Sequence, residues 1–175
     1  KAFGSKAINA YNFAKKTDCT HLFIVDAYDM FVLGDMQTAL DRIQDKDVML
    51  FNAEKACWPD GEKAVLYPEC DSDWKYLNGG GIFTRTDLFI KFFEDHPIKH
   101  LDNDQRNYSN QFVEDAAKYK MKLDTNCDVF QSIAFEHPGD FFFDEGRLFN
   151  VKTRTFPIII HGNGKTNMDK IYRLL

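Results

Sequence analysis

Short apolar runs alternate with amphipathic stretches over the first two thirds of the chain, and this alternation limits the fold more than any other sequence feature. Residues His21–Val25 and 47–52 are apolar runs of the length that buried strands have. Residues 5–16 and 34–43 instead carry apolar side chains at helical spacing. Strands that alternate with helices predict an α/β fold, here a mixed, mostly parallel sheet flanked by helices.

The remaining segments extend this pattern and become richer in strands. Residues 54–78 are polar and aromatic, and a loop of this length inside a compact domain is usually functional. Gly79-Gly80-Gly81 then leads into a strand at residues 82–83. We expect helices over 86–95 and 104–118, and short strands near 129–130, 141–143, 148–151 and 157–160.

Composition excludes several classes of protein. Of the 175 residues, 44% are hydrophobic and 17 are Phe, which is more apolar material than a disordered chain carries. The formal charge of −5 argues against a nucleic-acid binder, which needs a basic face. No apolar run approaches the roughly 20 residues of a membrane span. The length fits one domain over residues 1–175, and the start at Lys1 without Met favours a processed or excised piece whose compartment stays open.

The cysteines leave the redox state open as well. None of them forms a C-x-x-C pair, so a structural zinc site or thioredoxin motif is not expected; they are Cys19, Cys57, Cys70 and Cys127. A Cys57–Cys70 disulfide would close a short loop, but buried thiols fit equally well. Asn107-Tyr108-Ser109 matches a glycosylation sequon, which matters only in a secretory compartment.

The sharpest chemical signal is a pair of carboxylates at the end of a predicted strand. Asp26 and Asp29 directly follow His21–Val25, and open α/β sheets bind ligands at the carboxyl ends of their strands. Two nearby oxygen donors suit Mg²⁺ or Mn²⁺. A turn-capping Asp26 and a solvated Asp29 are the structural alternative. The pairs Asp71/Asp73 and Asp102/Asp104 are weaker candidates because neither follows a buried strand.

A second strand end carries compatible groups. His161 follows the apolar run at 158–160, and imidazole is a reasonable Mn²⁺ ligand. Gly162-Asn163-Gly164 lets backbone amides approach a phosphate closely, with Lys165 in the same region.

These motifs together resemble the glycosyltransferase domain of the procollagen lysyl hydroxylase and collagen glycosyltransferase family, over about residues 1–167. The resemblance rests on their order along the chain: 23–29 (FIVDAYD), 51–54 (FNAE), 57–59 (CWP), 67–68 (YP), 76–81 (YLNGGG), 104–105 (DQ), 128–131 (DVFQ) and 161–164 (HGNG). The family implies a GT-A fold that uses a UDP-sugar and Mn²⁺ or Mg²⁺. It further implies transfer of a hexose to a hydroxyl acceptor, such as collagen hydroxylysine or its galactosylated form.

The resemblance also implies roles for individual residues. Asp26, Asp29 and His161 would hold the metal, and Tyr28 would stack on the uracil. The diphosphate would lie against Asn163, Gly164 and Lys165, and the donor sugar against Asn78, Gly79 and Gly80. Trp58 would border the sugar pocket.

Asp104, with Gln105 beside it, would act at the transferred sugar, where a carboxylate can stabilise an oxocarbenium-like centre or take the acceptor proton. Its structural alternative is to cap the following helix. Glu54, Glu69 and Asp102 are weaker candidates.

The sequence departs from the family pattern at its start. A GT-A domain begins with a strand that contacts the nucleotide base, whereas here a helix comes first, so we expect an N-terminally truncated domain. The outer edge of the His21–Val25 strand would then be unpaired, so that either a second chain covers this edge or the fragment is marginally stable and binds UDP poorly. Two other interpretations remain: a catalytically silent GT-A-like interaction module, and a metal-dependent phosphohydrolase, whose D-x-D pattern residues 26–29 do not match.

Overall fold

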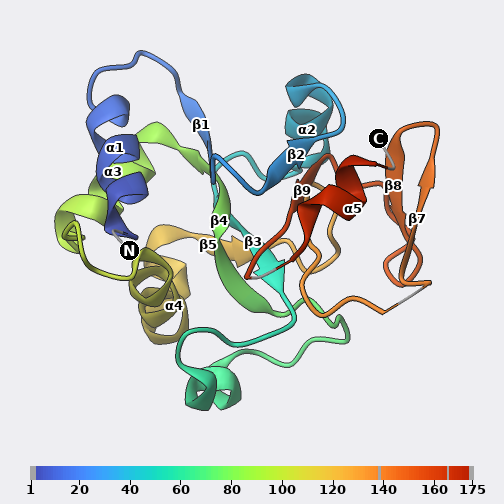
Figure 1. Cartoon of the computed structure of the whole chain (residues 1–175). Helices are drawn as coiled ribbons and strands as arrows, with labels where there is room; N and C mark the ends of the chain where they lie inside the picture. The colour runs from blue at the N-terminus through green and yellow to red at the C-terminus, as the bar shows by residue number, and fades with distance from the viewer. Residues whose placement is uncertain (1–2, 138, 165, 174–175) are drawn as a thin grey trace.

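A computed structural model of the chain describes residues 3–137, 139–164 and 166–173. Its elements follow one another as shown in Figure 1. The helices are α1 (Gly4–Ala14), α2 (Met36–Arg42), α3 (Thr86–Asp95), α4 (Asp104–Asp115) and α5 (Met168–Tyr172), with 3₁₀ turns η1 (Gly61–Leu66) and η2 (Ala116–Tyr119). The strands are β1 (His21–Val25), β2 (Met30–Val32), β3 (Met49–Glu54), β4 (Tyr76–Arg85), β5 (Met121–Leu123), β6 (Phe130–Ser132), β7 (Phe141–Asp144), β8 (Arg147–Asn150) and β9 (Ile159–His161).

The main sheet has the strand order β1-β4-β3-β5. A second sheet has the order β2-β9-β6, and β7 and β8 form a hairpin. The mixed α/β class is therefore confirmed. Within the described residues β1 forms one edge of the main sheet and pairs only with β4, so its outer edge is unpaired, as the sequence predicted.

The expectation of mostly parallel strands is wrong in detail. Four of the six strand pairs in the described part of the chain are antiparallel. The reason is β4, which lies antiparallel between β1 and β3, while β1, β3 and β5 run in the same direction. Connections that contain helices make β1, β3 and β5 parallel to one another. The long segment after β3, however, leads into β4, which runs back between β1 and β3 and is antiparallel to both.

Alternate side chains of the main sheet build two separate cores. Ile82 faces a core shared with α1, α3 and α4, whose largest members include Phe51, Phe89 and Tyr108. Phe83, its neighbour in β4, faces the opposite core with α2, β6 and β9. Figure 1 shows α1, α3 and α4 on one side of the main sheet, and α2, the second sheet and the hairpin on the other. Since successive strand residues point to opposite faces, one strand serves both cores.

The ends of the helices follow from their capping residues. Asp35 caps α2 by accepting a hydrogen bond from the Thr38 N–H at 2.8 Å. Asn103 caps α4 by accepting one from the Arg106 N–H at 2.9 Å. Side-chain caps of this kind satisfy backbone donors that the helix leaves free.

The glycine run lies inside β4 and distorts it, whereas the sequence pattern predicted it ahead of the strand. The β3–β4 register shifts between Phe51 and Asn52, so that Phe51 faces Ile82 but Asn52 faces Asn78. The three glycines at 79–81 therefore have no paired residue in β3. Bulges of this sort re-aim backbone next to active sites, and glycine tolerates the close approach that results.

Four short elements were not predicted: β2, β5, α5 and η1, the last within the long 54–78 segment. In the described parts of the chain, no helix combines the length and the apolar character needed to cross a bilayer.

Candidate functional site

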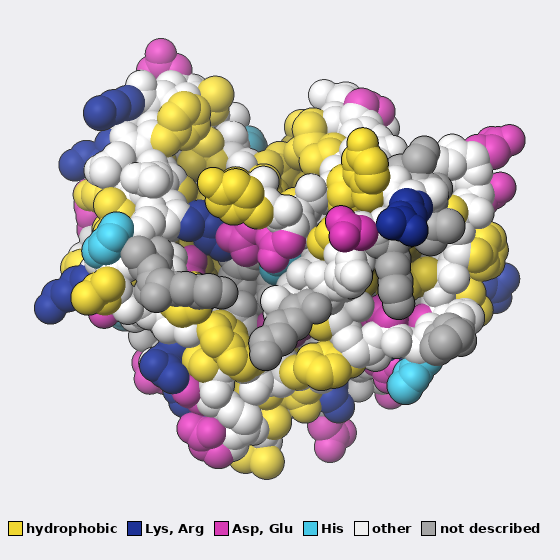
Figure 2. Space-filling model, in the orientation of Figure 1, with side chains coloured by type: hydrophobic (Ala, Val, Ile, Leu, Met, Phe, Trp, Pro, Cys, Tyr) yellow, Lys and Arg dark blue, Asp and Glu magenta, His cyan; other side chains and the backbone are white. Residues whose placement is uncertain are grey.

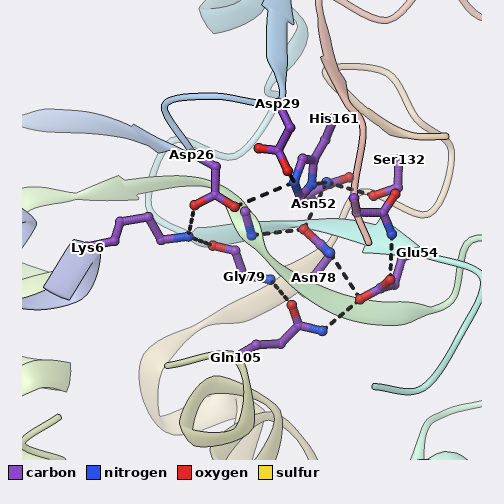
Figure 3. A network of polar contacts seen from close by, with 12 residues as sticks. Lys6, Asp26, Asp29, Asn52, Glu54, Asn78, Gly79, Gln105, Ser132 and His161 are labelled. Atoms are coloured by element: carbon purple, nitrogen blue, oxygen red, sulfur yellow. Dashed lines mark hydrogen bonds and ion pairs between the residues drawn. The ribbon is translucent and has the colours of Figure 1, made fainter. Parts of the chain in front are cut away.

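Three side chains from separate segments meet at one end of the strands (Figure 3). Asp26 follows β1, Asp29 precedes β2 and His161 ends β9. One ligand atom from each lies within 4.8 Å of the other two. The His161 Nε2 atom is 3.5 Å from Asp26 Oδ2 and 3.6 Å from Asp29 Oδ2. The convergence that a shared metal requires is confirmed, while metal binding itself stays a prediction.

Backbone hydrogen bonds hold the two aspartates in place. The Asp26 N–H donates to the Gly80 carbonyl at 2.9 Å, and the Asp29 carbonyl accepts from the Gly162 N–H at 2.7 Å. A hydrogen bond from the His161 ring lowers the pKa of the Asp29 carboxyl. Figure 2 shows acidic side chains gathered near the middle of this face, where the surface is hollowed.

Gly80 makes room for the histidine. A Cβ atom at Gly80 would lie 2.1 Å from His161 Cε1 and 2.6 Å from its Nδ1. No side chain fits at such distances, so the absence of one at residue 80 is what lets the buried imidazole sit against β4. The glycine run therefore shapes the site directly.

Lys6 brings a positive charge to the same place. Its Nζ lies 2.7 Å from Asp26 Oδ1, 2.5 Å from the Gly79 carbonyl and 3.7 Å from Asp104 Oδ2. The lysine thus links a predicted metal ligand to a predicted catalytic carboxylate. The sequence analysis did not single it out, because it is one of several lysines on an amphipathic helix.

Asp104 is the first residue of α4 and is largely buried, with 7% of its surface exposed. Burial raises the pKa of its carboxyl, and the Lys6 ammonium opposes that rise. The helix cap is Asn103, so Asp104 is free of the structural role that was its alternative.

A buried carboxylate organises the floor beside these groups. Glu54 Oε1 accepts from Asn78 Nδ2 at 3.0 Å and from Gln105 Nε2 at 2.7 Å, and Oε2 accepts from Asn163 Nδ2 at 2.6 Å. Burial raises the pKa of Glu54, and the three amide donors oppose that rise. Gln105 in turn accepts from the Gly79 N–H at 3.0 Å. Residues predicted to line the donor sugar are thereby joined in one network.

The sequence had ranked Glu54 among its weaker candidates. The available signal was its position at the end of a buried strand, in the 51–54 motif. What the sequence did not show was that amides from three distant segments all point at it.

The other predicted residues differ in how they are presented. Tyr28 is fully exposed and Trp58 is 47% exposed. The Trp58 ring packs edge-to-face with that of Phe3, with 6.2 Å between the ring centroids. Asn163 is buried between Glu54 and the Ala134 N–H, which donates to its Oδ1 at 3.0 Å. Gly164 has a φ of 73°, a left-handed conformation natural for glycine. Lys165 lies outside the described residues.

The rival acidic pairs have structural partners instead. Asp73 is paired with Lys152 at 2.6 Å, and Asp102 accepts from the Lys99 N–H at 2.8 Å. Among the described residues, the Asp26, Asp29 and His161 group is the only set of three with metal-site geometry.

The cysteines and the sequon fall outside the site. All four cysteines are free thiols, of which Cys127 is buried and Cys19 exposed. The sequon lies within α4, where Tyr108 and Ser109 are buried. A helical, half-buried acceptor is a poor place for a glycan.

The fold and the site define a class of protein: the chain is a mixed α/β, GT-A-like glycosyltransferase domain. It belongs to the family described as the PLOD GT domain, whose model matches residues 6–172.

Comparison with known proteins agrees. The chain is 30% identical over 166 residues to the human multifunctional procollagen lysine hydroxylase and glycosyltransferase LH3, covering 91% of this chain and 22% of LH3. It is 29% identical over 169 residues to an uncharacterized protein of Acanthamoeba polyphaga mimivirus, covering 94% of this chain and 36% of that protein. A Drosophila melanogaster procollagen-lysine,2-oxoglutarate 5-dioxygenase is 30% identical over 159 residues, covering 86% of this chain and 22% of that protein. The chain therefore spans about a third or less of these relatives.

Proposed function

We propose that this chain is the catalytic domain of a metal-dependent glycosyltransferase that moves a hexose from a UDP-sugar to a hydroxyl acceptor. By family resemblance the acceptor is hydroxylysine of a collagen-like chain, or its galactosylated form. The observation that carries the proposal is the convergence of Asp26, Asp29 and His161 beside the glycine run of β4. Membership of the family and the similarity to LH3, a protein named as a glycosyltransferase, support it.

The donor set fits a divalent cation. Two carboxylate oxygens and one imidazole nitrogen within 4.8 Å of one another suit Mn²⁺ or Mg²⁺ and leave further positions for phosphate oxygens. A bound cation would neutralise the charge that develops on the departing UDP. The His161 imidazole occupies the space that a Cβ atom at residue 80 would fill, and from this position it lies close to both carboxylates.

The remaining residues would bind and orient the donor. The exposed ring of Tyr28, between the two metal carboxylates in sequence, would stack on the uracil. The backbone at Asn163 and Gly164, with Lys165, would meet the diphosphate. Asn78, Gly79 and Gly80 would line the sugar, held in place by Glu54 and Gln105.

Asp104 would act on the reacting centre. Its buried carboxylate lies 3.7 Å from Lys6, which favours the ionised form needed to stabilise an oxocarbenium-like sugar or to take the acceptor proton. Trp58, half exposed at the rim, would border the acceptor side.

Calorimetric titration with Mn²⁺, then with UDP, followed by an assay of UDP release from UDP-sugars, tests the proposal. We expect Asp26→Asn and Asp29→Asn to abolish Mn²⁺ binding and turnover, whereas Asp41→Asn, an exposed carboxylate on α2, changes neither. Binding of Mn²⁺ and UDP without any turnover would support the silent interaction module instead. Phosphate release from a generic ester would support the phosphohydrolase.

A further inference from the structure

Asn52 sits directly behind the predicted metal ligand His161. It is fully buried at the point where the pairing of β3 with β4 shifts. Its Nδ2 lies 2.9 Å from Ser132 Oγ, 3.2 Å from Asn78 Oδ1 and 3.3 Å from His161 Nδ1. Its Oδ1 is buried and, in the described part of the chain, has no hydrogen-bond partner. A buried amide oxygen without a partner is costly and calls for a physical reason.

The arrangement determines where the proton of the imidazole lies. A neutral histidine carries one N–H, and the other ring nitrogen accepts. An amide NH₂ group that faces Nδ1 requires a lone pair there, so the proton lies on Nε2. That Nε2–H points at Asp26 and Asp29, 3.5 and 3.6 Å away, which suits the site without a cation.

A bound cation needs the opposite tautomer. Coordination uses the lone pair of Nε2, so the proton must lie on Nδ1 and must find an acceptor there. The NH₂ group of Asn52 cannot accept it. Half a turn of the amide brings Oδ1 to face Nδ1, so that the unpartnered oxygen gains a donor.

The rotation changes the hydrogen bonds that Asn52 makes with its neighbours. Ser132 has a hydroxyl that can accept from NH₂ or donate to Oδ1. Asn78 Oδ1 loses its bond to Asn52 but keeps the one from the Gly80 N–H at 2.8 Å. The rotation therefore gives Oδ1 the His161 Nδ1–H and the Ser132 hydroxyl as donors, but it breaks the bond to Asn78 and turns the NH₂ group to the place where Oδ1 now lies without a partner.

We propose that Asn52 is a positioning residue whose amide selects the tautomer of His161, so that cation binding and rotation of this buried amide occur together. The inference rests on the proposed metal site but concerns a residue to which no metal or substrate role has been given. Because the rotation sacrifices the Asn52–Asn78 bond, the affinity of the site for a cation is lower than its three ligands alone would give.

The test is ¹⁵N NMR of the His161 ring in the folded chain, with Mg²⁺ as a diamagnetic probe, together with calorimetric Mg²⁺ titration. We expect the Nε2–H tautomer without metal and the Nδ1–H tautomer with Mg²⁺. Asn52→Asp offers an acceptor in either orientation, so it should show the Nδ1–H form even without metal and bind Mg²⁺ about tenfold more tightly. Asn52→Leu offers none and should weaken binding about 10–100-fold.

Asn150→Asp is the matched control, because Asn150 is also fully buried but donates to Gln131, away from His161. It should leave the His161 tautomer unchanged. The Nδ1–H form in metal-free wild type, or an unchanged tautomer in Asn52→Asp, would overturn the inference. If the wild type binds neither Mg²⁺ nor Mn²⁺, the proposed metal site fails, yet the metal-free spectra of wild type and Asn52→Asp still decide the role of Asn52.

Discussion

Gly80→Ala should expel the His161 ring from its position. The added Cβ would lie 2.1 Å from Cε1, 2.6 Å from Nδ1 and 2.8 Å from Nε2. Carbon atoms in contact normally stay about 3.5–4.0 Å apart, so the ring must retreat by roughly 1.5 Å. It cannot do so freely, because only 4% of its side-chain surface is exposed and Asn52 lies behind it.

Two measurable consequences follow from that displacement. Forcing the extra atom into a packed region should cost about 1–3 kcal/mol of unfolding free energy, measured by urea denaturation. Metal–ligand distances tolerate only about 0.2 Å, so the site loses its imidazole and the Mn²⁺ affinity should fall at least about 100-fold, or roughly 2.7 kcal/mol, by calorimetry.

Gly81→Ala separates the two effects. Its Cβ would meet the Phe130 ring at 2.7 Å, so it should destabilise the fold to a similar degree. Its severe clash is with this apolar ring, whereas Asn52 Cβ lies at 3.3 Å and His161 is not among its nearest neighbours, so the variant should lose far less Mn²⁺ affinity than Gly80→Ala. Gly61→Ala, with no atom within 4 Å of the new Cβ, should change neither quantity. If folded Gly80→Ala binds Mn²⁺ as the wild type does, His161 is not a ligand in this geometry.

Three further perturbations test the surroundings of the site. Lys6→Met removes a cation 2.7 Å from Asp26, and relief of about 1 kcal/mol of repulsion should tighten Mn²⁺ binding about fivefold in calorimetry; weaker binding would contradict this. Glu54→Gln turns an NH₂ group toward amide donors that now bind a carboxylate, so chemical denaturation should show a loss of about 1–3 kcal/mol, and an unchanged midpoint would mean the network is dispensable. Burial raises the pKa of Asp124 from 3.8 to about 6, so the folded state holds this proton longer than the unfolded chain does. The protonated Asp124 therefore contributes up to about 3 kcal/mol to the free energy of unfolding below about pH 4, and this contribution is lost as the pH rises through about 6. Asp124→Asn should flatten that part of the curve of unfolding free energy against pH relative to wild type.

The sequence alone determined the class of fold and the identity of the metal candidates. Apolar periodicity located β1, α2, α3 and most of α4, because these elements bury a continuous stripe or run. The carboxylates after β1 and the histidine after the last strand were predicted from the rule that strand ends carry ligands, and the order of short motifs indicated the family.

Only the tertiary structure decided how β4 is inserted, and with it the shape of the site. Strand pairing is a long-range property, so nothing local to 76–85 states that this strand runs antiparallel between β1 and β3. The shift at Asn52 leaves the glycines unpaired by β3, and this brings Gly80 against His161. Glu54, Lys6 and Asn52 matter because of partners far away in the chain, and the energy of a buried hydrogen bond depends on those partners, not on sequence neighbours.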